Sequence, residues 1–295
     1  FINEREGDQT SVQWRADKNW HANRNRIQSV LQQFRDRDPA LLVDIHDGQF
    51  QSAEAQEALN SHLHQSDLLI LDFQLEGVEG SGRRAIEIIL GLSQNNHFNM
   101  VVVHSTANLN SAFSRILFSL LPASTFEQAI IDGGTATIEE VEDSSRTVPK
   151  IISEGLSLNE YLLALEEGLE NLLSDELGEI PFRRRFCELL KICGSDKTKT
   201  LAVIAALMQR FETDNKIGSV NAPPLAVTCS IPGRNETMWI RTETLFVTFV
   251  NKAAESDLLK ALTDGILDWK PSPSRVFSAK LRAEIDDKGV RFEDS

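Results

Sequence analysis

The sequence predicts an α/β fold with a parallel sheet in its first half, followed by an α+β domain. Apolar segments alternate with amphipathic segments between residues 23 and 121. The apolar segments lack the alternation of a half-exposed strand, which is typical of strands buried on both faces of a parallel sheet. After residue 180 the order changes to paired helices and then paired strands, which favours an α+β arrangement. The 295 residues are therefore divided into domains at 1–155 and 156–295.

Each element of the first half has a local reason. Helices are predicted where apolar residues recur every three or four positions, and strands where β-branched and other apolar residues run together. A serine cap opens the second helix, and Pro39 and Pro122 end two others. The expected helices are 23–36, 52–65, 81–94 and 109–121, and the expected strands are 40–45, 67–73 and 99–106.

The second half is less regular. Residues 122–150 contain two adjacent glycines and an acidic, serine-bearing run, which favours an irregular insertion or linker. The turn PGRNE lies between two β-branched segments and predicts an antiparallel hairpin. The expected helices are 157–173, 181–193, 197–211, 254–269 and 274–288, and the expected hairpin strands are 224–231 and 238–250.

Composition excludes several classes of function. The net charge is −14, and residues 1–180 hold 29 acidic and only 12 basic side chains, so this part repels nucleic-acid phosphates. No apolar run approaches the length of a membrane span. The three cysteines have no zinc-binding or redox spacing, which is typical of a reduced, cytoplasmic protein.

The segment 66–82, SDLLILDFQLEGVEGSG, places one aspartate near the end of an apolar strand. A buried, unpaired carboxylate costs several kcal/mol unless a cation or hydrogen-bond donors meet it. Ligands of open α/β sheets bind beyond the carboxyl ends of the strands. Asp72 and the pair Ser105–Thr106 end consecutive predicted strands, so we expect them to lie at the same edge.

The order of these segments resembles the receiver domain of response regulators, in particular the divergent "response receiver" branch. DLLILDFQL is similar to the strand that carries the phosphate-accepting aspartate, SGRRAIEIILGL to the next helix, and VVVHSTAN to the next strand. The resemblance covers roughly residues 40–108. It implies a flavodoxin-like fold and a two-component signalling function in a bacterial cytoplasm.

The resemblance also implies roles for single residues. Asp72 would accept the phosphoryl group and bind Mg²⁺, and Thr106 or Ser105 would sense the new phosphate. Members of the family have a lysine that closes the site, and the candidate here is Lys150 in TVPKIIS. Their acidic metal-binding pair follows a first strand, and no apolar strand precedes the helix at 23–36. Mg²⁺ is therefore expected only if that pair lies upstream of a truncated start.

Three alternatives remain open at this stage. Asp72 also fits a solvated strand end, and a helix cap fits Thr106 as well as the sensor role does, so the chain is either a phosphorylated receiver or a pseudo-receiver that only binds proteins. A winged-helix-like segment at 181–250 would instead make it a DNA-binding regulator, which its near-neutral charge disfavours. No nucleophile–base pair indicates an enzyme. The expected partner is a histidine-kinase-type or other signalling protein, and a homodimer is left open.

Overall fold

The computed structural model describes residues 20–36, 43, 66–75, 82–94, 98–106, 108–144, 148–174, 182–218, 226–231, 235–252 and 257–274. The chain forms two compact units, residues 1–49 and 50–295, and each is described by itself. The first contains helix α2 (Trp20–Arg35), which confirms the helix predicted at 23–36. All other described elements belong to the second unit.

A five-stranded mixed sheet forms the centre of the second unit, with strand order β1-β2-β5-β4-β3. The first three strands in this order are parallel, whereas β4 is antiparallel to both β5 and β3. The strands are β1 (Leu68–Asp72), β2 (Asn99–Ser105), β3 (Thr228–Cys229), β4 (Trp239–Arg241) and β5 (Leu245–Asn251). Strands from distant parts of the sequence therefore share one sheet.

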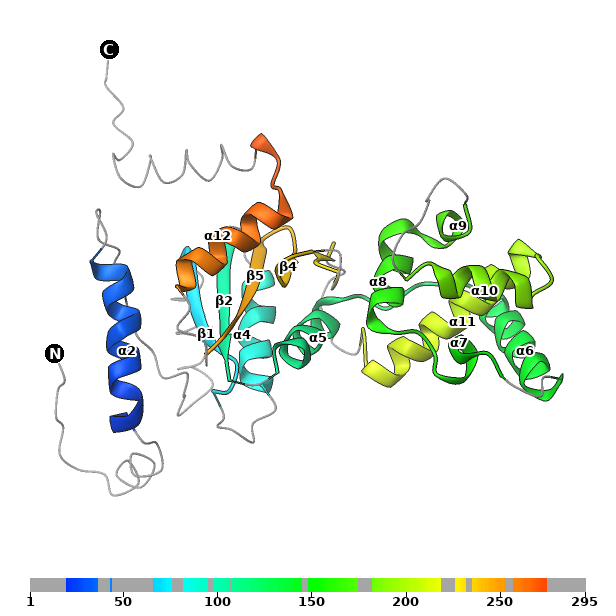
Figure 1. Ribbon diagram of the computed structural model, residues 1–295, viewed down its shortest axis with the longest axis horizontal. Coiled ribbons are helices and arrows are strands. Elements are labelled where there is room, and N and C mark those ends of the chain that lie inside the picture. Colours follow the sequence, from blue (N-terminus) through cyan, green and yellow to red (C-terminus); the bar gives the residue numbers. More distant parts are fainter. Residues whose placement is uncertain are drawn as a thin grey trace, which may run out of the picture. The chain divides into compact units, whose positions relative to one another are not determined.

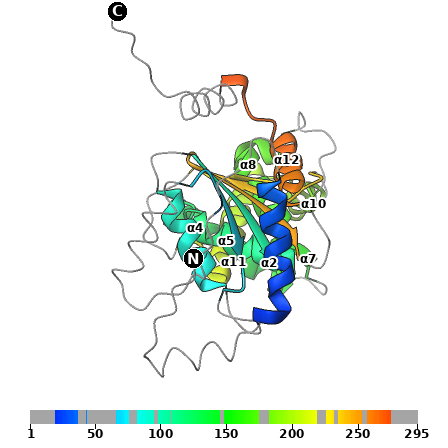
Figure 2. The ribbon, with the colours of Figure 1, turned by 90° about the vertical axis from the view of Figure 1, so that its left-hand side faces the viewer.

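Helices cover both faces of this sheet (Figures 1 and 2). Helix α12 (Leu258–Trp269) lies on the face to which β5 directs Phe246, and the Phe246 and Trp269 rings stack with centroids 5.3 Å apart. Helices α4 (Arg83–Ser93) and α5 (Leu109–Leu120) lie on the other face, where Phe113 meets Phe249 edge-on. Alternate residues of β5 thus enter two different core layers.

A group of helices follows α5 in the sequence and is seen together in Figure 1. Its longest pair, α6 and α11, packs closely because Gly134 of α6 lies against the backbone of Ala202 in α11. The helices of this group are α6 (Gln128–Ser144), α7 (Lys150–Ser153), α8 (Leu158–Glu167), α9 (Leu169–Leu172), α10 (Arg184–Ile192) and α11 (Lys197–Asn215).

The expected strands 67–73 and 99–106 and helices 81–94 and 109–121 correspond to β1, β2, α4 and α5. The irregular linker expected at 122–150 is wrong, because α6 occupies 128–144. Its two glycines and β-branched residues are weak helix formers, and packing against α11 overrides that preference. Gly168, with φ of +75°, divides the helix expected at 157–173 into α8 and α9.

The predicted α/β class is confirmed in its coarse form, since parallel strands are flanked by helices. The division at residue 155 does not separate the strands, because β3, β4 and β5 join the sheet of β1 and β2. The antiparallel hairpin expected between 224–231 and 238–250 is present as β3 and β4. The single strand expected at 238–250 is wrong, because it divides into β4 and β5 and β5 pairs in parallel with β2, so the segment is neither an independent hairpin nor a wing. The predicted helices 52–65 and 274–288 and most of the strand 40–45 lie outside the described residues.

Within the described residues, no helix is long and apolar enough to cross a lipid bilayer.

The α6–α11 contact gives a direct test of packing. A Cβ added at Gly134 would lie 2.0 Å from the Ala202 carbonyl oxygen, so Gly134→Ala should lower the free energy of unfolding by about 1–3 kcal/mol. Gly133 has no such neighbour within 4 Å, so Gly133→Ala should raise it by up to about 1 kcal/mol. Urea unfolding of both variants measures the difference, and equal effects would contradict the close helix contact.

Candidate functional site

Asp72 lies where β1 leaves the core. Leu71 is buried, whereas the Asp72 side chain keeps 39% of its surface exposed. Its Oδ1 accepts a hydrogen bond from the backbone N–H of Gln74 at 2.9 Å. The carboxylate therefore emerges at the carboxyl end of the parallel strands, where a ligand can reach it.

Lys252 supplies the positive charge beside this carboxylate. It directly follows β5, and its Nζ forms an ion pair with Asp72 Oδ2. Its backbone N–H donates to the carbonyl oxygen of Ser105 at 2.8 Å, which fixes the end of β5 against the end of β2. Because the Lys252 side chain is only 15% exposed, its ammonium is held at the site.

The end of β2 brings the two predicted sensor residues to the same edge. Ser105 is fully buried, whereas Thr106 is exposed and its hydroxyl donates to Oε1 of Gln74. Helix α5 begins shortly afterwards, and its cap is Asn108, whose side chain accepts from the N–H of Asn110. Thr106 is therefore not the helix cap that the alternative interpretation required.

The loop after β1 is anchored by Phe73, which is buried next to Asp72. Gly82, with φ of +67°, passes so close that an added Cβ would lie 2.3 Å from the ring. The Arg115 guanidinium of α5 lies 6.0 Å from the ring centroid, within the range of a cation–π contact. These contacts hold the loop that carries Gln74 against the core and α5.

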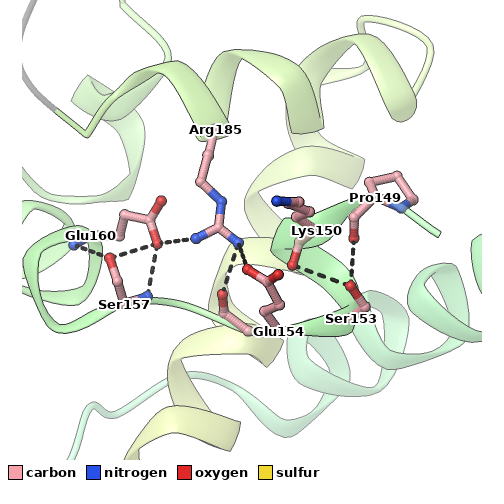
Figure 3. A network of polar contacts seen from close by, with 8 residues as sticks. Pro149, Lys150, Ser153, Glu154, Ser157, Glu160 and Arg185 are labelled. Atoms are coloured by element: carbon pink, nitrogen blue, oxygen red, sulfur yellow. Dashed lines mark hydrogen bonds and ion pairs between the residues drawn. The ribbon is translucent and has the colours of Figure 1, made fainter.

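Lys150, the lysine predicted from the sequence, lies elsewhere in the same unit. It begins α7, where its carbonyl oxygen accepts from the hydroxyl of Ser153 (Figure 3). Beside it, Arg185 forms an ion pair of 2.8 Å with Glu160, the residue that completes the capping box of α8. The structure brings Asp72, Ser105 and Thr106 together but places Lys252, not Lys150, against Asp72.

Neither Lys252 nor Gln74 was among the residues predicted from the sequence. A usable signal for Lys252 existed, since the apolar strand LFVTFV ends in Asn251 and a lysine. The 180 positions between Asp72 and Lys252 concealed their proximity. Gln74 carries no comparable signal, because nothing in the sequence indicates that its side chain meets Thr106.

Asp72 is a candidate ligand for a metal ion at this edge of the sheet. Among the described residues, no group of three or more histidine, cysteine, aspartate or glutamate side chains is arranged to hold a metal ion. Asp72 offers a hard oxygen ligand of the kind that Mg²⁺ prefers. The expected Mg²⁺ depends on a further acidic pair, so it stays a prediction.

Helix α5 links this edge to the helical group. Its Phe113 contacts Phe249 of β5, with ring centroids 5.4 Å apart. Five residues later in the same helix, Phe118 contacts Phe211 of α11, with ring centroids 5.7 Å apart. The helix therefore touches both the strand that carries Lys252 and the longest helix of the group.

A buried carboxylate strengthens this link. Glu212 of α11 accepts from the backbone N–H of Ser124 at 3.1 Å, from the Ser124 hydroxyl, and from Tyr161 OH at 2.9 Å. Burial and the neighbouring Glu212 carboxylate raise the pKa of Tyr161 above its usual value, so its phenol stays protonated and donating. The segment after α5 is thereby fixed to α8 and α11.

Comparison with models of protein families finds a match for this chain. The family model described as "Response receiver domain" matches residues 3–151, about half of the chain. This range contains Asp72, Ser105 and Thr106, whereas Lys252 lies beyond it. No curated protein and no solved structure matches the chain.

The ion pair can be tested without assuming any activity. In a double-mutant cycle of Asp72→Asn and Lys252→Met, we expect a coupling of about 1 kcal/mol in the free energy of unfolding, because the pair is partly exposed. Added salt should weaken it. The matched cycle of Asp72→Asn with Lys150→Met should be additive, and coupling in that cycle alone would contradict the contact described here.

Proposed function

The chain belongs to the response receiver family, and from this premise we propose that Asp72 accepts a phosphoryl group and that the helical group passes on the result. The proposal rests on one observation: Asp72, Lys252 and Thr106 lie close together at the carboxyl ends of the parallel strands. A nucleophilic carboxylate, a cation for the incoming phosphate and a hydroxyl donor are the groups that such a transfer needs.

The proposed step begins with a phosphohistidine on a partner protein. One Asp72 oxygen forms a bond to phosphorus, while the phosphorus–nitrogen bond breaks and its electron pair returns to the imidazole. Lys252 then faces a phosphoryl group instead of a bare carboxylate and stabilises its added negative charge. Mg²⁺, when bound, would offset further charge, with Asp72 as one of its ligands.

The proposed output is a protein contact made through α6–α11. Helix α5 supports this role because its Phe113 and Phe118 contact β5 and α11, and Ser124 ties its following segment to Glu212. A histidine-kinase-type protein is the proposed donor, and the site is proposed to work in the cytoplasm, where the three free cysteines would remain reduced. Turnover of a small molecule is not part of the proposal.

Beryllofluoride with Mg²⁺, a mimic of the acyl phosphate, tests the acceptor role. The full-length wild-type protein should bind it in a calorimetric titration, and Asp72→Asn should not, because the mimic needs the carboxylate oxygen. Lys252→Ala should weaken binding about tenfold or more, since it removes a charge-assisted contact. Lys150→Ala is the matched control and should bind like the wild type.

Absence of binding by the wild type would favour the pseudo-receiver instead. Equal losses in the two lysine variants would show that Lys252 has no special relation to the phosphate.

Thr106 is the residue proposed to transmit the change. Thr106→Ala should leave the fold nearly intact, because the threonine is exposed, but should suppress the response of α5 to the mimic. Amide hydrogen exchange over 109–120, with and without beryllofluoride, measures that response. If the variant retains the full change in exchange, the signal does not pass through Thr106.

A further inference from the structure

Gln74 occupies an unusual position, since it contacts the acceptor and the sensor at once. Its backbone N–H donates to Asp72 Oδ1 at 2.9 Å. Its side-chain Oε1 accepts from the hydroxyl of Thr106. Buried Phe73, between Asp72 and Gln74, holds this loop in place. The two groups that the proposed function needs are thus joined through one residue.

The contact with Thr106 has a direct consequence. A threonine hydroxyl has a single proton to donate. While that proton is donated to Gln74, it is unavailable to an oxygen on a phosphorylated Asp72. Any movement of Thr106 toward the phosphate must first break its hydrogen bond with Gln74.

The second contact of Gln74 changes in the same event. When Asp72 forms a bond to phosphorus, its carboxylate charge moves to the phosphoryl oxygens. The N–H of Gln74 then donates to a weaker acceptor, because hydrogen bonds to charged groups are stronger than those to neutral groups. Phosphorylation of Asp72 therefore weakens the hydrogen bond that positions Gln74, the residue that holds Thr106.

We propose that Gln74 is a positioning residue that holds the Thr106 hydroxyl in its inactive direction and so sets how readily the site responds to phosphate. This inference rests on the proposed function. Removal of the side-chain acceptor should release Thr106 beforehand, so that less free energy is spent on rearrangement when the phosphoryl group arrives. Gln74 then restrains activation by holding Thr106, and it takes no part in the phosphoryl transfer.

The test compares beryllofluoride affinity in the presence of Mg²⁺ for full-length wild type and Gln74→Met. Methionine has a similar length but lacks the amide acceptor. One neutral hydrogen bond corresponds to a gain in affinity of about two- to tenfold. The matched control is Gln94→Met, at the exposed C-cap of α4, which should bind like the wild type.

The same substitution in the Thr106→Ala variant distinguishes restraint of Thr106 from a general effect on the loop. In Thr106→Ala no hydroxyl is left to hold, so adding Gln74→Met should leave affinity unchanged. A gain that persists in that background overturns the inference, as does unchanged or weaker binding by Gln74→Met alone. Failure of the wild type to bind at all overturns the proposed function together with the inference, and is thus distinct from failure of the inference alone.

Discussion

Parallel pairing between β2 and β5 is the interaction on which the site depends. The register joins Asn99 to Leu245 at one end and Ser105 to Asn251 at the other, so the two strands end together. Lys252 is the next residue, and this register alone brings it to Asp72 on the neighbouring β1. A slip of one position would turn the alternating side chains of β5 to the opposite faces and remove both Phe249 and Lys252 from their partners.

The long helical segment between β2 and β5 is compatible with their pairing because its two ends, after α5 and after α11, lie close together. Gly218, after α11, passes so close to Ala123, after α5, that an added Cβ would lie 2.7 Å from the Ala123 Cβ. Ser124 and Glu212 fix the same junction by hydrogen bonds. A segment whose ends meet adds little closure entropy to folding of the sheet, whatever its own length. The helical group therefore lies between α5 and β3 in the chain without disturbing the strand order of the sheet.

The elements that could be predicted from the sequence are those determined by interactions between residues close together in the chain. The apolar runs of β1 and β2 and the amphipathic stripes of α4 and α5 carry strong periodic signals, so these elements and the exposed end at Asp72 follow from the sequence. Helix α6 does not, because its stability comes from Gly134 meeting α11 and not from its own propensity. The position of Lys252 could not be predicted for a similar reason. Its contact with Asp72 depends on pairing of strands 180 positions apart, which no local pattern encodes.

The pairing of β2 with β5 connects the site to helix α5 in two ways. Thr106 precedes α5 along the chain, whereas Phe249, three positions before Lys252, contacts Phe113 within it. A charge change at Asp72 alters the partner of Lys252 directly and that of Thr106 through Gln74. Typical couplings of this kind are about 1–3 kcal/mol and arise only from contacts that differ between the two states. Under the proposed function the contacts of Gln74 and Lys252 would differ in that way, and α5 is the helix to which both are connected.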